Sequence, residues 1–348
     1  MGIAKETDCR HQVKIKRFLL WGSGLFVLLL LVFSLIVSHP NRLDFLRGDI
    51  IPVSISPGMN ARAVAGEFAA AGVVKNPGRL LYWMQRMQID RKLSPGLYKI
   101  RSGIAWSVAH SLKEATPEVL RVAIIPGLTL ADVQKKQGIS GSNDALITAL
   151  NDDSNFPPRL QELLPEKAAD RLSLIAPDTY LLPPGEKAAK QLVQSGSKRW
   201  LELLGGYLSE NLTKKELLNK AILASVVEKE AQKNQERARM AGVFQNRLNR
   251  NMPLQSCATI VYSWKQQGVS LQSLRYRHLE INSPYNTYKR LGLPPGSIGI
   301  PGVFSWKAAF EPEKTDYLFF VAQEDGSHIF SKTYQEHLAA QKKIQMKK

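Results

Sequence analysis

The sequence predicts an α+β protein with a single N-terminal transmembrane helix. Residues 18–38 form a run of 21 residues without a charged side chain. Behind this run, short segments of strand character, such as residues 51–55 and 96–100, alternate with helical segments. Longer helical patterns dominate residues 186–251. This mixed order, in a chain of 348 residues that is 44% hydrophobic and 22% charged, is typical of a globular α+β protein with two domains.

The uncharged run is long enough to cross a membrane. At about 1.5 Å per residue, a helix of this length spans a hydrocarbon core of roughly 30 Å. A cleaved signal peptide is the alternative, but its apolar core is usually shorter, about 7–15 residues. Because basic residues favour the cytoplasmic side, we expect a cytoplasmic tail (1–17), a transmembrane helix (18–38), a connector (39–50) and the rest of the chain outside. The basic residues before the run are Lys5, Arg10, Lys14, Lys16 and Arg17.

The chain is strongly basic. Lys and Arg outnumber Asp and Glu by 47 to 30, a net charge of +17. This balance indicates an anionic partner: nucleic acid, a lipid headgroup surface or an acidic polymer. The predicted topology excludes nucleic acid, because most of the chain lies outside the cytoplasm. Cys9 and Cys257 are too few for a disulfide framework, and the six histidines lack metal-ligand spacing. We expect neither a metal nor a cofactor.

Residues 51–137 read as a small α+β module. Strands are predicted at 51–55 and 96–100, with helices at 61–71, 77–87 and 106–115. The order of strand, turn and helix then partly repeats, with a strand at 119–125 and a helix at 130–136. A strand–helix–helix–strand unit of this kind resembles the LysM family of glycan-binding modules. The alternative is a spacer between membrane and second domain. Residues 138–175 are predicted to be a polar, helical linking region.

The helix predicted at 217–230 carries the first candidate for chemistry. Thr213 and Glu216 form a capping box that starts it. Glu228 shares a face with Leu217, Ala221 and Ala224, so its carboxyl group is expected at the end of a buried stripe. Apolar walls keep a carboxylic acid neutral, as a general acid must be. Alternatively, Glu228 is simply the first polar residue after a buried turn. Glu230 points elsewhere and is expected in solvent.

Further sequence motifs lie on both sides of this helix, over residues 177–328. A further helix is expected at 236–251, ending at Asn251 in a left-handed conformation. With these motifs the chain resembles the YceG-like, or MltG, family of endolytic murein lytic transglycosylases, and 176–341 is then the catalytic domain, followed by a basic tail (342–348). The carrying segments are 177–180 (PDTY), 224–230 (ASVVEKE), 241–248 (AGVFQNRL), 252–255 (MPLQ), 285–288 (YNTY), 292–296 (GLPPG) and 325–328 (DGSH).

The resemblance implies an activity. Family members cut the β-1,4 bond between N-acetylmuramic acid and N-acetylglucosamine in nascent peptidoglycan and leave 1,6-anhydro ends, without water. Glu228 matches the catalytic acid/base of the family. A second carboxylate is dispensable, because the C6 hydroxyl of the sugar is the nucleophile. The implied location is the bacterial inner membrane, with the catalytic domain outside the cytoplasm. Implied partners are glycan strands, membrane lipid and peptidoglycan synthases. The competing class is a non-catalytic, membrane-anchored glycan-binding or scaffolding protein.

Other matched residues are candidates for binding substrate. Amides read sugar hydroxyl and N-acetyl groups, and aromatic rings stack on pyranose rings. The same residues serve turns equally well. Cys257 and Ala258 stand where many family members have Asp-Pro, so no role of that Asp transfers to this chain. The candidates are Gln255, Ser256, Tyr285, Asn286, Tyr288 and His328.

Overall fold

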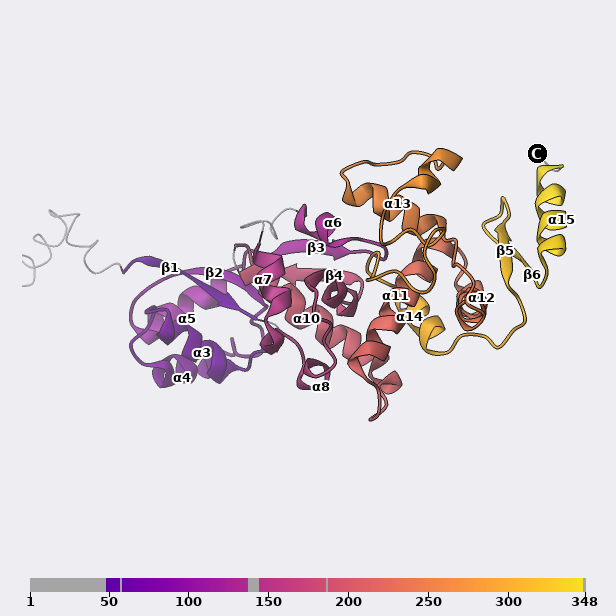
Figure 1. Ribbon diagram of the computed structural model, residues 1–348. Coiled ribbons are helices and arrows are strands. Elements are labelled where there is room, and N and C mark those ends of the chain that lie inside the picture. The colour runs from indigo at the N-terminus through magenta and orange to yellow at the C-terminus, as the bar shows by residue number, and fades with distance from the viewer. Residues whose placement is uncertain (1–47, 57, 137–143, 186, 347–348) are drawn as a thin grey trace, which may run out of the picture. The chain divides into compact units, whose positions relative to one another are not determined.

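The computed structural model describes residues 48–56, 58–136, 144–185 and 187–346 (Figure 1). It is a mixed α+β structure in which helices predominate and each sheet has two strands. The described chain divides into two compact units, one ending at Pro117 and one formed largely from Glu118 onward. No helix among the described residues is long and apolar enough to cross a membrane, and the span predicted at 18–38 lies outside them.

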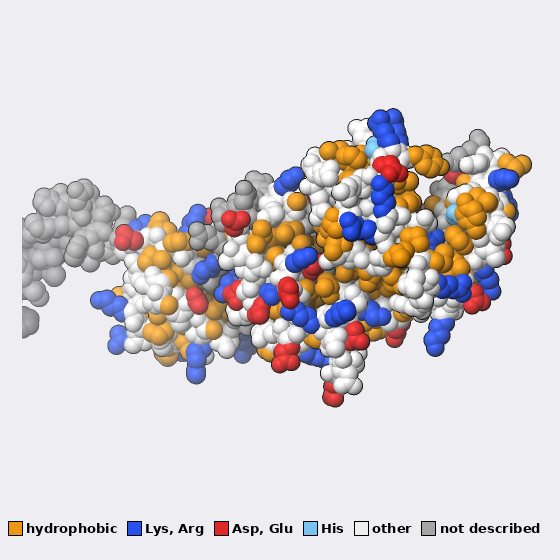
Figure 2. Space-filling model, viewed as in Figure 1, with side chains coloured by type: hydrophobic (Ala, Val, Ile, Leu, Met, Phe, Trp, Pro, Cys, Tyr) orange, Lys and Arg blue, Asp and Glu red, His pale blue; other side chains and the backbone are white. Residues whose placement is uncertain are grey.

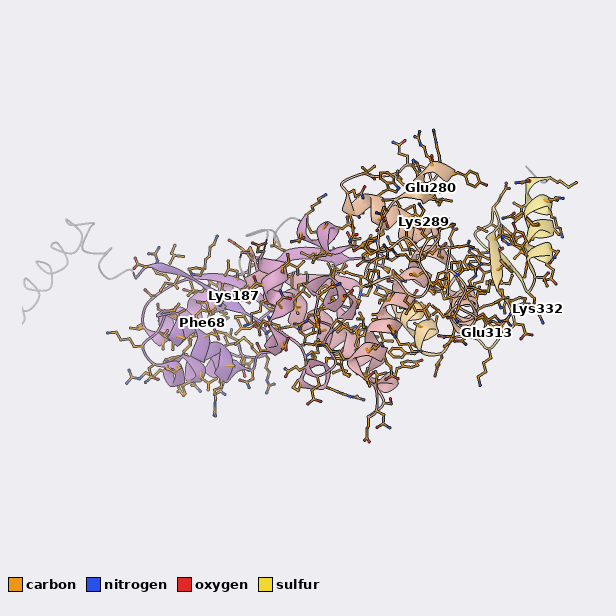
Figure 3. All side chains as sticks on the ribbon, viewed as in Figure 1. Phe68, Lys187, Glu280, Lys289, Glu313 and Lys332 are labelled. Carbon is orange, nitrogen blue, oxygen red and sulfur yellow. The ribbon has the colours of Figure 1, made fainter. Side chains whose placement is uncertain are left out.

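The first unit has the strand–helix–helix–strand order that the sequence predicts. β1 and β2 form a two-stranded sheet, and the side chains of Asn60 and Asn76 cap the two helices between them by accepting hydrogen bonds from Ala63 N and Arg79 N. Phe68, labelled in Figure 3, is fully buried in the core of this unit. The elements are β1 (Ile50–Ile55), α3 (Ala61–Ala70), α4 (Pro77–Arg86), β2 (Gly96–Arg101) and α5 (Ala105–Glu114).

The structure divides the chain earlier than the sequence does. Strand β3 (Leu120–Ile124) pairs antiparallel with β4 (Asp178–Leu182), with Val122 opposite Tyr180. This pairing places β3 in the second unit, whereas the sequence groups residues 119–137 with the first module. The partial repeat at 119–136 has the predicted strand and helix, but its strand partner lies beyond the supposed linking region. The local sequence pattern carries no information about which distant strand β3 pairs with.

The rest of the second unit is mainly helical. Residues 144–175 are helical as expected, but they are no polar linker, because Leu146, Leu150, Phe156 and Leu160 are buried in its core. The elements are α6 (Leu130–Gln134), α7 (Ala145–Asn151), η1 (Asp153–Asn155), α8 (Pro158–Gln161), α9 (Ala168–Arg171), η2 (Leu172–Leu174), α10 (Lys187–Leu204), η3 (Gly205–Tyr207), α11 (Lys214–Glu230), η4 (Asn234–Glu236), α12 (Arg237–Asn249), α13 (Cys257–Gln266), η5 (Tyr276–Glu280), α14 (Val303–Phe310), β5 (Phe319–Ala322), β6 (His328–Ser331) and α15 (Tyr334–Gln345).

Helix α11 is the central element of the second unit. It packs against α12, α13 and α14 (Figure 1). The predicted capping box is present: Thr213 Oγ1 accepts from Glu216 N, and the Glu216 carboxylate accepts from Thr213 N at 2.8 Å. Every residue from Ala221 to Val227 is buried, Ser225 included. The apolar run in the sequence thus forms a buried helical segment, and the last turn of the helix, Glu228–Glu230, is less buried.

Candidate active site

Glu228 lies in the last turn of α11, at the end of the predicted stripe. Leu217, Ala221 and Ala224 on the same face are fully buried or nearly so. The Glu228 side chain itself is only 9% exposed. The position on a buried face is therefore confirmed.

The carboxylate of Glu228 is held by three donors on one oxygen. Oε2 accepts from the backbone N–H of Gly302 at 2.8 Å and from Ser305 Oγ at 2.8 Å. Arg237 Nη1 lies 3.0 Å from the same atom in an ion pair. Among the described residues, all three of these contacts are made to Oε2. One oxygen of the carboxyl group is therefore fixed by a backbone group, a hydroxyl group and a guanidinium group.

The donors are themselves fixed by neighbouring elements. Arg237 begins α12, its side chain is 10% exposed, its Nε donates to Asn234 Oδ1 at 3.0 Å, and its Nη1 donates to Ser305 Oγ. Gly302 and Ser305 lie at the start of α14, where backbone N–H groups are free and the helix dipole favours negative charge. A Cβ on Gly302 would lie 3.0 Å from Glu228 Oε2, so glycine permits the backbone to approach this closely.

Beside the apolar walls expected around Glu228, the structure places a charged group that the sequence did not predict. A guanidinium group stands beside the carboxylate, because a buried arginine needs a charged or polar partner. The sequence contains Arg237 within the second predicted helix, but its burial depends on how α12 packs on α11 and α14. Neither Arg237 nor Ser305 was predicted as a site residue. The available signal was weak: an arginine at the start of a helix that follows the acid by nine positions.

Glu228 and Arg237 line a pocket of about 510 Å³ in the second unit. Its walls are mostly apolar, including Trp200, Leu203 and Phe304. Phe304 is 53% exposed and Leu203 is 37% exposed, so large apolar surface is open to solvent here. Other lining residues are Ala123, Ile124, Ile125, Pro126, Ala176, Pro177, Asp178, Thr179, Leu204, Asn234, Pro301, Gly302, Val303 and Trp306.

The pocket lining includes a second carboxylate that the sequence did not single out. Asp178 begins β4 and belongs to the PDTY segment quoted above. Its Oδ2 lies 3.7 Å from Arg199 Nε, and Oδ1 accepts from Thr179 N at 2.7 Å. The motif was recognised in the sequence, but its proximity to Glu228 follows only from the β3–β4 pairing and the packing of α10 on β4.

Charge does not mark the pocket. On the face seen in Figure 2, Lys and Arg side chains are scattered among Asp and Glu rather than gathered in one continuous patch. The pocket lining carries two carboxylates and one guanidinium, from Glu228, Asp178 and Arg237. The net charge of +17 is therefore a property of the whole chain and not of the candidate site.

The prediction that Glu230 lies in solvent is wrong, because its carboxylate contacts the protein. Its Oε1 accepts from Ser256 Oγ at 2.5 Å and from Ala258 N at 3.2 Å, at the start of α13. The carboxylate thus supplies an acceptor to the N-terminus of α13, where N–H groups lack intrahelical partners. Ser256, a predicted binding residue, is 2% exposed and is engaged in this contact. The last turn of α11 therefore serves two purposes, with Glu228 in the pocket and Glu230 joining α11 to α13.

The remaining predicted residues of the 255–288 region lie together, around this same junction. Gln255 is exposed and adopts a left-handed conformation (φ 48°), and its N donates to Thr287 O. Asn286 is fully buried; its Nδ2 donates to the Leu279 and Ile281 carbonyls and its Oδ1 accepts from Tyr288 N. Tyr288 Oη lies 3.1 Å from Cys257 Sγ. Burial raises the pKa of Tyr288.

Tyr285 is half-buried and lies in a polar cluster with Tyr262 and Asp170. Its ring lies 4.9 Å from that of Tyr262, and burial raises the pKa of both tyrosines. A Cβ on Gly296 would lie 2.9 Å from Tyr285 Oη and 2.6 Å from Asp170 Oδ1, so the glycine permits close packing here. Glu280 and Lys289, labelled in Figure 3, form an ion pair at 2.6 Å in the same segment. None of Gln255, Ser256, Tyr285, Asn286 and Tyr288 lines the Glu228 pocket.

His328 lies elsewhere again. Its side chain is 4% exposed, and its Nδ1 is 2.8 Å from Glu236 Oε2, while its backbone N–H donates to Glu236 Oε1. These contacts join β6 to the segment before α12, and His328 is absent from the pocket lining. The described residues contain no group of three or more His, Cys, Asp or Glu that could hold a metal ion.

Comparisons with known proteins agree with this architecture. The sequence model of the YceG-like family matches residues 53–343, so the chain belongs to the YceG-like family. The chain is 28% identical over 308 residues to the endolytic murein transglycosylase of Bacillus subtilis, covering 84% of each chain. It is 29% identical over 319 residues to the corresponding Streptococcus pneumoniae protein, covering 82% of this chain and 57% of that one. The crystal structure of a YceG-like protein from Listeria monocytogenes superposes with a TM-score of 0.52 at 25% identity, covering 84% of this chain and 99% of that chain.

Proposed function

We propose that this protein is an endolytic murein transglycosylase in which Glu228 is the catalytic acid and base. The observation that carries this proposal is the buried Glu228 carboxyl group, held through Oε2 by Arg237, Ser305 and Gly302, in a pocket of about 510 Å³. Membership of the YceG-like family and the names of the relatives support it. The bond cut is the β-1,4 bond between N-acetylmuramic acid and N-acetylglucosamine.

The reaction needs one carboxyl group used twice. Neutral Glu228 donates its proton to the glycosidic oxygen as the C1–O bond breaks. The C6 hydroxyl oxygen of the same muramic acid then attacks C1, and its proton passes to the Glu228 carboxylate, which restores the acid. Between the two transfers Glu228 is an anion, and Arg237 with the Gly302 N–H stabilises that charge. Neither water nor a cofactor enters the balance.

The products distinguish this reaction from its alternatives. Mass spectrometry of fragments released from purified peptidoglycan should show 1,6-anhydro ends, which arise only when C6 is the nucleophile. Reducing ends would identify a hydrolase. The absence of any fragment, combined with retained glycan binding, would identify the non-catalytic scaffolding alternative. A zymogram with the same preparation reports cleavage independently of the chemistry of the ends.

Asp178 gives the hydrolytic alternative a specific form, because ordinary glycosidases use two carboxyl groups. In the proposed mechanism Asp178 orients sugar hydroxyl groups and takes no proton from the nucleophile. Asp178→Asn should therefore lower kcat less than about tenfold, against at least about 100-fold for loss of the catalytic acid. Cleavage rates of both variants on the same glycan measure the difference. A loss for Asp178→Asn as large as that for Glu228→Gln would favour the two-carboxylate mechanism.

The first unit is proposed to be a LysM-like glycan-binding module. The order β1, α3, α4, β2 and the pairing of β1 with β2 support this assignment. The alternative is a spacer without affinity for glycan. Six residues remain proposed as substrate contacts, although none of them lines the Glu228 pocket: Gln255, Ser256, Tyr285, Asn286, Tyr288 and His328. Peptidoglycan synthases are proposed partners.

The proposed topology has its own test. Residues 18–38 would anchor the chain in the inner membrane, with residues 1–17 in the cytoplasm and the YceG-like region outside, where peptidoglycan lies. A reporter enzyme that is active only outside the cytoplasm, fused after Lys348, should be active. A reporter that works only in the cytoplasm should be inactive at the same position. The reverse pattern would refute both the orientation and the access to peptidoglycan.

A further inference from the structure

The two-stranded sheet β3–β4 has one face packed on the core and one face open. Val122, Ile124, Tyr180 and Leu182 point inward and are at most 8% exposed. The side chains between them point the other way, since successive residues of a strand alternate between faces. Leu181 on this side is 48% exposed, and Val119 and Ile125, which flank β3 at its two ends, are 42% and 55% exposed. The sheet face is defined here as Val119, Arg121, Ala123, Ile125, Thr179 and Leu181.

The sheet face is continuous with the pocket that contains Glu228. Ala123, Ile125 and Thr179 belong to the sheet face and also line that pocket. Arg121 lies opposite Leu181 in the register, two pairs beyond Ala123 and Thr179 and therefore on the same face. Residues 119–125, which are β3 with one flanking residue at each end, span up to about 20 Å at roughly 3.3 Å per residue. The apolar surface therefore runs from the candidate acid to well outside the pocket.

The chemistry of the sheet face fits a linear glycan. Pyranose rings present C–H faces that pack on aliphatic side chains and hydroxyl edges that bond to polar ones. The sheet face offers aliphatic surface from Val119, Ile125 and Leu181, with Thr179 and Arg121 as hydrogen-bonding groups among them. A polymer cut within its length must leave the pocket on both sides of the broken bond, and an open strand surface permits this whereas a closed cavity does not.

We propose that the sheet face binds the glycan strand on one side of the bond cut beside Glu228 and so selects long strands over short ones. This inference rests on the proposed function and adds a binding surface to it. Leu181 is about half exposed, so a sugar can cover roughly half of the apolar area of its side chain. Removing that contact costs binding of long strands about fivefold.

The test compares substrates of two lengths. Leu181→Thr keeps a strand-compatible residue but removes apolar surface. Its kcat/KM should fall about fivefold on long, peptide-free glycan strands, mainly through KM, and fall less on the shortest oligosaccharide that the wild type cuts. The double variant Val119→Thr/Leu181→Thr should lower further the long-to-short ratio, which is kcat/KM on long strands divided by kcat/KM on the short oligosaccharide. Leu338→Thr on α15, a residue 39% exposed, is the matched control and should leave both values unchanged.

The outcomes separate this inference from the proposed function. If the wild type produces anhydro ends but neither variant changes the long-to-short ratio, the sheet face does not bind glycan and the proposed function stands. If the loss appears only on strands that carry peptides, the sheet face reads peptide and the inference is wrong. Val119→Thr alone, a substitution that preserves shape, keeps the test decisive if Leu181→Thr fails to fold. Circular dichroism establishes folding for each variant.

Discussion

Replacing Glu228 by glutamine should reduce glycan cleavage by at least about 100-fold, the usual scale of positioned acid–base catalysis. Glutamine keeps the shape of the side chain, and its carbonyl oxygen can still accept from Gly302 N and Ser305 Oγ. It cannot donate a carboxylic proton or take one from the C6 hydroxyl. Initial rates of release of anhydro fragments from purified peptidoglycan measure the loss.

Stability and a matched substitution provide the controls for this experiment. Glu228→Gln removes the charge that pairs with Arg237, so the free energy of unfolding should fall by about 1–2 kcal/mol. The rate must therefore be referred to folded protein. Glu230→Gln changes the same residue type two positions on and retains an acceptor for Ser256. It should cost much less activity. Wild-type rates in Glu228→Gln, or equal losses in the two variants, would contradict the assignment of the acid.

Replacing Arg237 by methionine should lower kcat about 10- to 100-fold, because the acid loses the group that orients Oε2. Methionine fills much of the volume but offers no donor. Both partners are about nine-tenths buried, so removing the cation leaves the buried carboxyl group without its charged partner. The free energy of unfolding should fall by about 3 kcal/mol, at the low end for a buried ion pair. Urea unfolding and steady-state kinetics on glycan give the two quantities.

Two further measurements separate orientation of the acid from simple loss of stability. The double variant Glu228→Gln/Arg237→Met should be more stable than Arg237→Met alone, because no unpaired charge remains. Arg237→Lys, which keeps the charge but not the planar fork, should recover stability better than kcat. An effect of Arg237→Met on KM alone would show that Arg237 binds substrate instead of positioning Glu228.

The sequence predicted those parts of the structure that depend on local rules. The capping box at Thr213 and Glu216, the buried stripe ending at Glu228 and the left-handed Asn251 (φ 52°) all follow from spacing and side-chain chemistry within a few residues. The strand–helix–helix–strand order of the first unit follows in the same way. The cap and the left-handed turn are stabilised mainly by their own neighbours along the chain, whereas the buried stripe is visible in the sequence as a period and is stabilised by packing on α12, α13 and α14.

The partners of the acid could not be predicted, because they come from distant parts of the chain. Gly302 and Ser305 lie 74 and 77 residues beyond Glu228, and the pairing of β3 with β4 brings Asp178 to the pocket. Tertiary packing also explains the error about Glu230. Helical periodicity placed it away from Glu228, as the structure does, but periodicity cannot show that α13 begins beside that face. The direction in which a helical side chain points is set by local sequence, whereas the residues that it contacts are set by tertiary packing.

The large sequence separation between Glu228 and its donors Gly302 and Ser305 has a consequence for synthesis of the chain. A ribosome completes Glu228 well before the segment that holds its carboxylate, with Gly302 following only 74 residues later. An unfinished chain, or one cleaved before Gly302, therefore carries the acid without two of the three donors on Oε2. We expect such fragments to be inert. Cutting activity would then begin only in chains whose C-terminal region is complete and folded, which protects the cell wall from damage by incomplete copies of the enzyme.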